Sequence, residues 1–125
     1  MARILVMDDD AGIRELIRDV LEESGHEVTE AEDGNKGMEL LQNVQFDLVI
    51  TDIVMPEKEG LETIIELRTC RPDLKIIAIS GGGSMDGRSY LEIAELFGAN
   101  RIFPKPIKMS ELLVAVDEVL QPALQ

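Results

Sequence analysis

The chain has 125 residues, of which 45% are hydrophobic and 30% charged, so we expect residues 1–125 to form one domain around one core. Its formal net charge is −13, which argues against direct nucleic-acid binding because the required basic surface is missing. The single Cys70 cannot form an intrachain disulfide, and no apolar run approaches the length of a membrane span or a signal peptide. We therefore expect a soluble, cytoplasmic protein with a reduced thiol.

Two kinds of periodicity alternate along the chain. Short apolar runs predict strands, which we expect at residues 4–7, 27–31, 47–51, 75–80 and 101–103. Apolar residues at helical spacing follow each run and predict five helices. Their apolar faces are Ile13, Leu16, Ile17, Val20 and Leu21; Met38, Leu40 and Leu41; Leu61, Ile64 and Ile65; Tyr90, Ile93, Ala94 and Phe97; and Leu113, Val116 and Leu120.

Polar side chains, glycines and prolines mark the expected helix ends. Asp10 is suited to cap the first helix, because its carboxylate can accept the free N–H groups of the first turn. Gly25 is expected to stop that helix, and Pro72 to stop the third. Ser110 is expected to cap the last helix.

The first, third and fourth strand runs are continuously apolar rather than alternating. This pattern is typical of parallel strands covered by helices on both faces. We therefore predict an α/β fold, a three-layer doubly wound, flavodoxin-like (βα)5 arrangement with a five-stranded parallel sheet in the order 2-1-3-4-5. Ligands of such folds bind outside the carboxyl ends of the strands where the winding reverses, here between the first and third strands.

Acidic side chains follow both of these strands. Asp8, Asp9 and Asp10 come after the first strand, and Asp52 comes after the third. An acidic loop in an acidic protein needs no function, and Asp10 is explained by capping. Carboxylates that meet at one edge repel each other, however, at a cost of about 4 kcal/mol for a pair at about 4 Å in a surface-like dielectric. A cation would compensate, and oxygen ligands with open positions for a phosphate suit Mg²⁺.

Two further polar residues are expected at the same edge. Ser80 ends the fourth strand, and Lys105 follows the fifth. Alone, Ser80 is explained as a hydroxyl bonded to backbone and Lys105 as an exposed lysine in a proline-rich turn. Together with the acids, they indicate a site for a phosphoryl group.

The order ILVMDDD, LVITDIVMP, KIIAIS and IFPKP resembles the receiver (REC) domain of two-component response regulators over essentially the whole chain. The resemblance implies that Asp52 is the phosphoacceptor and that Asp8, Asp9, Asp52 and the backbone carbonyl of Val54 hold Mg²⁺. It also implies that Ser80 and Lys105 contact the phosphoryl oxygens, with a cis bond between Lys105 and Pro106.

The same resemblance implies a function in phosphorelay signalling. The donor would be a phosphohistidine on a histidine kinase or phosphotransfer protein, and the phosphorylated domain would act on a downstream protein through a switched interaction surface. Such a domain is a phosphoacceptor rather than an enzyme. It would contact neither nucleic acid nor membrane directly.

The sequence departs from the family pattern near its carboxyl end. Three residues before the site lysine the family usually has an aromatic side chain, whereas this chain has Ile102. Phe103 follows, but alternate strand residues face opposite sides of a sheet, so we expect Phe103 to pack in the core. The segment at residues 81–87 is also longer than usual. Val54 and Gly82 offer no polar side chain to orient a hydrolytic water, which predicts slow dephosphorylation.

Two alternatives stay open from the sequence. A small phosphohydrolase similar to the haloacid dehalogenase superfamily would use Asp8 as nucleophile and Asp10 as general acid, but would leave Asp52 without a role. An interaction module that keeps the fold without being phosphorylated is the second alternative.

Overall fold

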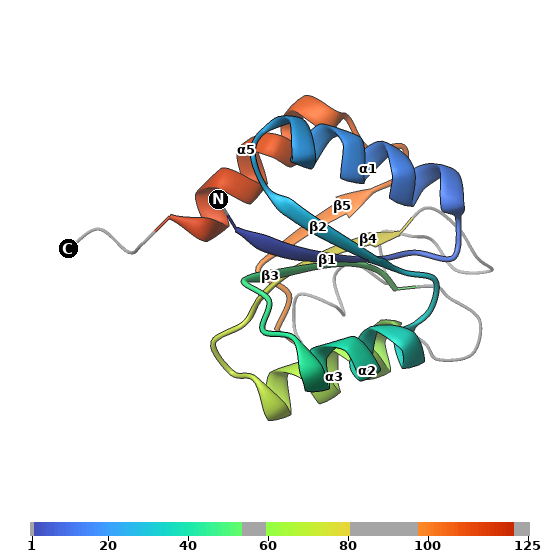
Figure 1. Ribbon diagram of the computed structural model, residues 1–125, viewed down its shortest axis with the longest axis vertical. Coiled ribbons are helices and arrows are strands. Elements are labelled where there is room, and N and C mark those ends of the chain that lie inside the picture. Colours follow the sequence, from blue (N-terminus) through green and yellow to red (C-terminus); the bar gives the residue numbers. More distant parts are fainter. Residues whose placement is uncertain (1, 54–59, 81–97, 122–125) are drawn as a thin grey trace.

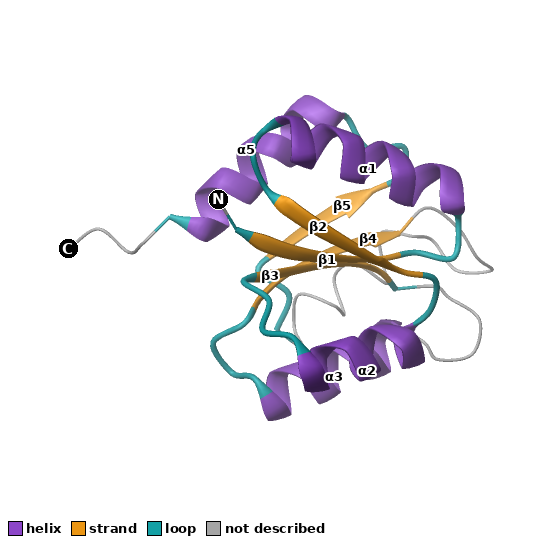
Figure 2. Cartoon of the chain, in the orientation of Figure 1, coloured by secondary structure: helices purple, strands orange, loops and turns teal. Residues whose placement is uncertain are grey.

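A five-stranded parallel β-sheet forms the middle layer of the computed structural model (Figures 1 and 2). The structure describes residues 2–53, 60–80 and 98–121. The strand order is β2-β1-β3-β4-β5, and every neighbouring pair is parallel. This arrangement confirms the predicted doubly wound fold and its strand order. The strands are β1 (Arg3–Met7), β2 (Glu27–Ala31), β3 (Leu48–Asp52), β4 (Lys75–Ser80) and β5 (Arg101–Pro104).

Helices cover both faces of the sheet. Helices α1 (Ala11–Glu23) and α5 (Met109–Leu120) lie on one face, and α2 (Gly34–Asn43) and α3 (Gly60–Cys70) lie on the other (Figure 1). The helix expected over Tyr90–Phe97 and the long segment at residues 81–87 lie outside the described residues. None of the described helices is long and apolar enough to cross a membrane.

The core divides into two apolar layers, one on each side of the sheet. In β1, Ile4 and Val6 pack toward α1 and α5, whereas Leu5 and Met7 pack toward α2 and α3. All four side chains are fully buried. Burial on both faces explains why the strand runs are continuously apolar instead of alternating.

Most predicted helix ends are confirmed. The Oδ1 atom of Asp10 accepts hydrogen bonds from the amides of Gly12 (2.9 Å) and Ile13 (3.3 Å) at the start of α1. After this helix Gly25 has a φ of +94°, a left-handed conformation that favours glycine.

The predicted cap of the last helix is wrong. Helix α5 begins at Met109, Lys108 is at the N-cap position without a side-chain cap, and Ser110 lies exposed in the first turn. The amides of Glu111 and Leu112 both donate to the carbonyl of Lys108. Because Met109 packs against the core on this side, the helix starts early enough to bury it.

Two members of the predicted apolar helix faces are exposed. Leu16 is 50% exposed and Ile65 is 45% exposed, whereas their neighbours Ile17 and Ile64 are fully buried. Consecutive helical residues point about 100° apart. In these two pairs one residue faces the sheet and the other points toward solvent.

Candidate functional site

The ends of β1 and β3 bring an acidic cluster together. These strands are neighbours in the sheet, and Met7 is level with Thr51, so the residues that follow, Asp8 and Asp52, come side by side. One carboxylate oxygen from each of Asp8, Asp9 and Asp52 lies within 4.8 Å of the others. Asp8 and Asp52 are buried and Asp9 is exposed. Asp52 is the last residue of β3, one position later than the predicted strand end, because it still pairs with Ile79 of β4.

Lys105, which follows the edge strand β5, also contacts this cluster. Its Nζ atom lies 3.0 Å from Oδ2 of Asp8 and 2.9 Å from Oδ2 of Asp52. The backbone amide of Lys105 donates to the carbonyl of Ser80 (2.9 Å), so the end of β4 fixes the lysine backbone. The bond between Lys105 and Pro106 is cis, as expected.

Burial and charge act in opposite directions on these groups. Burial raises the pKa of Asp8 and repulsion from Asp52 raises it further, although a hydrogen bond from the amide of Asp10 and the ammonium of Lys105 limit the rise. Burial alone would lower the pKa of Lys105, but its hydrogen bonds to Asp52 and Asp8 outweigh burial and raise that pKa. The lysine is therefore held charged between the two acids.

The donor set fits a divalent metal ion. Three carboxylates and one ammonium leave two net negative charges when all are ionised. Carboxylate oxygens are hard ligands of the kind that Mg²⁺ prefers, and the exposed Asp9 leaves room for the waters that this ion retains. The cluster could hold such an ion. The predicted fourth ligand, the carbonyl of Val54, lies outside the described residues, as does Gly82.

Ser80 supplies an unsatisfied donor at the same end of the sheet. It ends β4, is 1% exposed, and its Oγ has no hydrogen-bond partner in the described part of the chain. A buried hydroxyl without a partner is costly. The hydroxyl lies beside the end of β3, since Ser80 follows Ile79, which is paired with Asp52.

Asp10 has a different role from its acidic neighbours. It is not part of the acidic cluster found among the described residues, and its Oδ1 atom caps α1. The general-acid role that the hydrolase alternative requires would compete with this cap.

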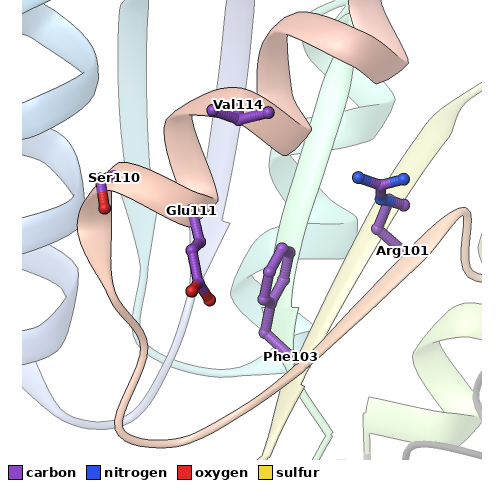
Figure 3. A pocket seen from close by; sticks show the side chains of 5 residues that line it. All are labelled: Arg101, Phe103, Ser110, Glu111 and Val114. Carbon is purple, nitrogen blue, oxygen red and sulfur yellow. The ribbon is translucent and has the colours of Figure 1, made fainter.

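Ile102 and Phe103 face opposite sides of β5, as predicted. Ile102 packs against the core beneath α2 and α3, and Phe103 packs against the core beneath α1 and α5. Phe103 is only partly buried, however, so its assignment to the core is correct only in part. It lines an open groove of about 370 Å³ between β5 and α5 with Arg101, Ser110, Glu111 and Val114 (Figure 3). The reason is that β5 is an edge strand, with no further strand to cover its side chains.

One contact to the site was not predicted from the sequence. Arg14, in the first turn of α1, donates from Nη1 to the backbone carbonyl of Asp8 at 2.6 Å. Arginines on an acidic helix normally indicate surface ion pairs. No sequence pattern distinguishes this arginine from such residues.

Together these features define a class of protein: a doubly wound α/β domain with an acidic cluster that could hold a metal ion, and a bridging lysine, at the point where the winding reverses. The chain belongs to the response regulator receiver domain family, which its sequence matches over residues 4–117.

Individual relatives agree with this family assignment. The response regulator MprA of Mycobacterium sp. (strain KMS) is 37% identical over 120 residues, which are 95% of this chain and 50% of MprA. The DNA-binding transcriptional regulator NtrC of Azospirillum brasilense is 37% identical over 119 residues, 95% of this chain and 24% of NtrC. The solved receiver domain of NtrX from Brucella abortus superposes with a TM-score of 0.88 at 29% identity, covering 96% of this chain and 99% of that domain. The chain thus spans about half the length of the MprA relatives.

Proposed function

We propose that residues 1–125 act as one receiver domain that accepts a phosphoryl group on Asp52 from the phosphohistidine of a histidine kinase or phosphotransfer protein. The observation that carries this proposal is the position of Lys105, whose Nζ atom contacts both Asp8 and Asp52 inside the acidic cluster. A cation fixed on a carboxylate of this cluster is suited to neutralise the charge of an incoming phosphoryl group.

Each site residue then has a defined task. A carboxylate oxygen of Asp52 forms the new bond to phosphorus while the bond from phosphorus to the donor histidine nitrogen breaks, and the departing imidazole takes up a proton from solvent. Lys105 and the hydroxyl of Ser80, which has no hydrogen-bond partner among the described residues, donate to the phosphoryl oxygens. Asp8, Asp9, Asp52 and the carbonyl of Val54 would hold Mg²⁺, which when bound neutralises and aligns the phosphoryl group.

Phosphorylation would change an interaction surface, through which the domain contacts a downstream protein. A hydrogen bond from Ser80 to a charged phosphoryl group contributes about 1.5–3 kcal/mol. Moving a two-state equilibrium from 1:99 to 99:1 needs about 5.5 kcal/mol. The hydroxyl alone is therefore insufficient, and Lys105 must contribute by changing its contacts with Asp8 and Asp52. In this proposal the domain is a phosphoacceptor and not a turnover catalyst.

The test is phosphorylation of the protein by acetyl phosphate with Mg²⁺, followed by intact-mass measurement and mapping of the adduct. We expect one base-labile phosphoryl group on Asp52, no labelling without Mg²⁺, and none in Asp52→Ala. Labelling that persists in Asp52→Ala but is lost in Asp8→Ala would support the hydrolase alternative instead. The absence of any labelling of the wild type would support the unphosphorylated interaction module.

A further inference from the structure

The backbone of Asp8 is held on both sides by hydrogen bonds. Its amide donates to the carbonyl of Ala31 at 3.2 Å, and its carbonyl accepts from Nη1 of Arg14 at 2.6 Å. That carbonyl belongs to the peptide group that joins Asp8 to Asp9. The orientation of this peptide group determines where the Cα atom of Asp9, and hence its carboxylate, lies relative to the rest of the acidic cluster.

The arginine that makes this contact is itself held in place. Nε of Arg14 donates to Oε1 of Glu30 at 3.1 Å, and only 16% of the Arg14 side chain is exposed. The other oxygen of Glu30 accepts from Nη1 of Arg18 at 2.7 Å. Glu30 lies in β2, so one carboxylate ties two arginines of α1 to the edge strand. A guanidinium has a planar set of donors, which lets Arg14 bind Glu30 and the Asp8 carbonyl at once.

Asp9 depends on this support more than the other two acids. The Asp8 carboxylate accepts a hydrogen bond from the amide of Asp10 and pairs with the ammonium of Lys105. Asp52 also pairs with Lys105. Asp9 is exposed and follows the end of β1. Among the described interactions, the hydrogen bond from Arg14 to the peptide before Asp9 is the side-chain contact that fixes its backbone from the α1 side.

We propose that Arg14 is a positioning residue of the metal site: oriented by Glu30, it fixes the peptide between Asp8 and Asp9 and thereby places the Asp9 carboxylate for Mg²⁺. This inference rests on the proposed function, since it assumes that the acidic cluster binds the ion. Groups that orient metal ligands without touching the metal typically change metal affinity by about 10–100-fold when they are removed.

Simple electrostatics predicts the opposite effect. Arg14 is a cation close to an anionic cluster, so removing its charge should strengthen the binding of another cation. Positioning predicts that removing Arg14 weakens binding. The sign of the change therefore distinguishes the two explanations.

Arg18 provides the matched control. It lies one helical turn further along α1 and donates to the same Glu30 carboxylate, but no hydrogen bond joins it to Asp8 among the described interactions. Arg14→Met and Arg18→Met each remove one positive charge and one ion pair with Glu30. Only Arg14→Met removes the contact with the Asp8 carbonyl.

The experiment measures Mg²⁺ binding by calorimetry on the wild type, Arg14→Met and Arg18→Met, together with thermal unfolding without Mg²⁺. We expect the Kd for Mg²⁺ to rise about tenfold in Arg14→Met and to stay within about twofold of the wild type in Arg18→Met, while unfolding temperatures fall similarly in both variants. Phosphorylation by acetyl phosphate should need correspondingly more Mg²⁺ in Arg14→Met but reach the wild-type rate at saturation. Arg14→Gln is the second variant should Arg14→Met not fold, with the same expectation.

Three outcomes would overturn the inference. Unchanged or tighter Mg²⁺ binding in Arg14→Met would show that this arginine acts only through its charge or not at all. Equal weakening in Arg18→Met would assign the effect to the ion pairs with Glu30. A wild-type protein that binds no Mg²⁺ would overturn the proposed function itself, which separates that failure from a failure of the Arg14 inference alone.

Discussion

Lys105 and Asp52 form an ion pair across 53 residues of sequence, with Nζ of the lysine 2.9 Å from Oδ2 of the acid. Asp52 ends β3 and Lys105 follows β5, while β4 lies between these two strands. Neighbouring strands are about 4.8 Å apart, so the lysine reaches over one strand to make the contact. The ion pair thus joins the end of β3 to the residue that follows β5.

Removing the bridging cation should destabilise the metal-free protein. In Lys105→Met the buried Asp8 and Asp52 lose their shared ammonium. We expect the free energy of unfolding at pH 7 to fall by about 1–3 kcal/mol, because a hydrogen bond between charged groups is lost. Urea denaturation in the presence of EDTA measures this loss.

Mg²⁺ should offset this loss, since it supplies positive charge to the same carboxylates. The stabilisation by saturating Mg²⁺ should be larger in Lys105→Met than in the wild type. Lys108→Met, which removes an exposed cation at the start of α5, is the control and should change stability by less than about 0.5 kcal/mol. An equal response of both variants to Mg²⁺ would contradict the bridging role.

Asp8→Asn should stabilise the metal-free protein at neutral pH. Burial, with repulsion from Asp52, raises the pKa of Asp8 above its ordinary value of 3.8. The native state therefore binds this proton more tightly than the unfolded chain does, and wild-type stability falls as pH rises from 3.8 through the raised pKa. An asparagine does not titrate, so the variant avoids this loss.

The difference between Asp8→Asn and the wild type should accordingly depend on pH and on metal. We expect a gain of about 1 kcal/mol in the free energy of unfolding at pH 7, shrinking to nothing below the ordinary pKa of Asp8. Excess Mg²⁺ should reverse the order, because the wild type alone keeps the complete set of carboxylates. A constant difference across the whole pH range would rule out titration of Asp8 as the cause.

Ser80→Ala should slow phosphorylation without lowering the stability of the unphosphorylated protein. The Ser80 hydroxyl is buried and lacks a partner in the described part of the chain. Its removal should leave the unphosphorylated protein as stable as the wild type or slightly more stable. Phosphorylation by acetyl phosphate should nevertheless become slower, by about tenfold if one hydrogen bond of about 1.5 kcal/mol to the transferring group is lost.

Thr51→Ala is the comparison for Ser80→Ala. The hydroxyl of Thr51 is also buried at the end of the sheet, but it already donates to the carbonyl of Asp52 at 3.0 Å. We expect this variant to lose about 1 kcal/mol of stability. A wild-type phosphorylation rate in Ser80→Ala would show that the hydroxyl does not contact the phosphoryl group.

The sheet and the acidic cluster could be predicted because both depend on patterns local in sequence. Continuous apolar runs identify strands buried on both faces, and the strand order then brings Asp8 and Asp52 together. The capping role of Asp10 followed from its position before an apolar helix face. The local pattern identifies each element, and the common strand order of such folds supplies the rest.

The errors arose where packing between distant elements decides the outcome. Met109 is partly buried against the core, and α5 begins there, one residue before the better capping residue, Ser110. Phe103 is partly exposed because β5 is an edge strand. The contact from Arg14 to the Asp8 carbonyl was missed for another reason: its acceptor is a backbone oxygen, which no side-chain pattern reveals.

Gly37→Ala should lower stability and weaken Mg²⁺ binding, because Gly37 packs against the residue that precedes Asp8. Gly37 lies in α2, where an added Cβ atom would come 2.0 Å from Sδ and 3.0 Å from Cγ of Met7. Met7 is fully buried at the end of β1, immediately before Asp8, so either its side chain or the backbone must shift to admit the added atom. We expect a loss of about 1–3 kcal/mol in the free energy of unfolding, typical of overpacking, despite the gain in helix propensity. Gly12→Ala, in the exposed first turn of α1, meets only the Asp10 carboxylate at 3.2 Å and should cost less.

Because the shift is passed to the backbone before Asp8, Gly37→Ala should also weaken Mg²⁺ binding. If Gly37→Ala is less stable but binds Mg²⁺ with wild-type affinity, Met7 absorbs the strain without moving the acidic cluster.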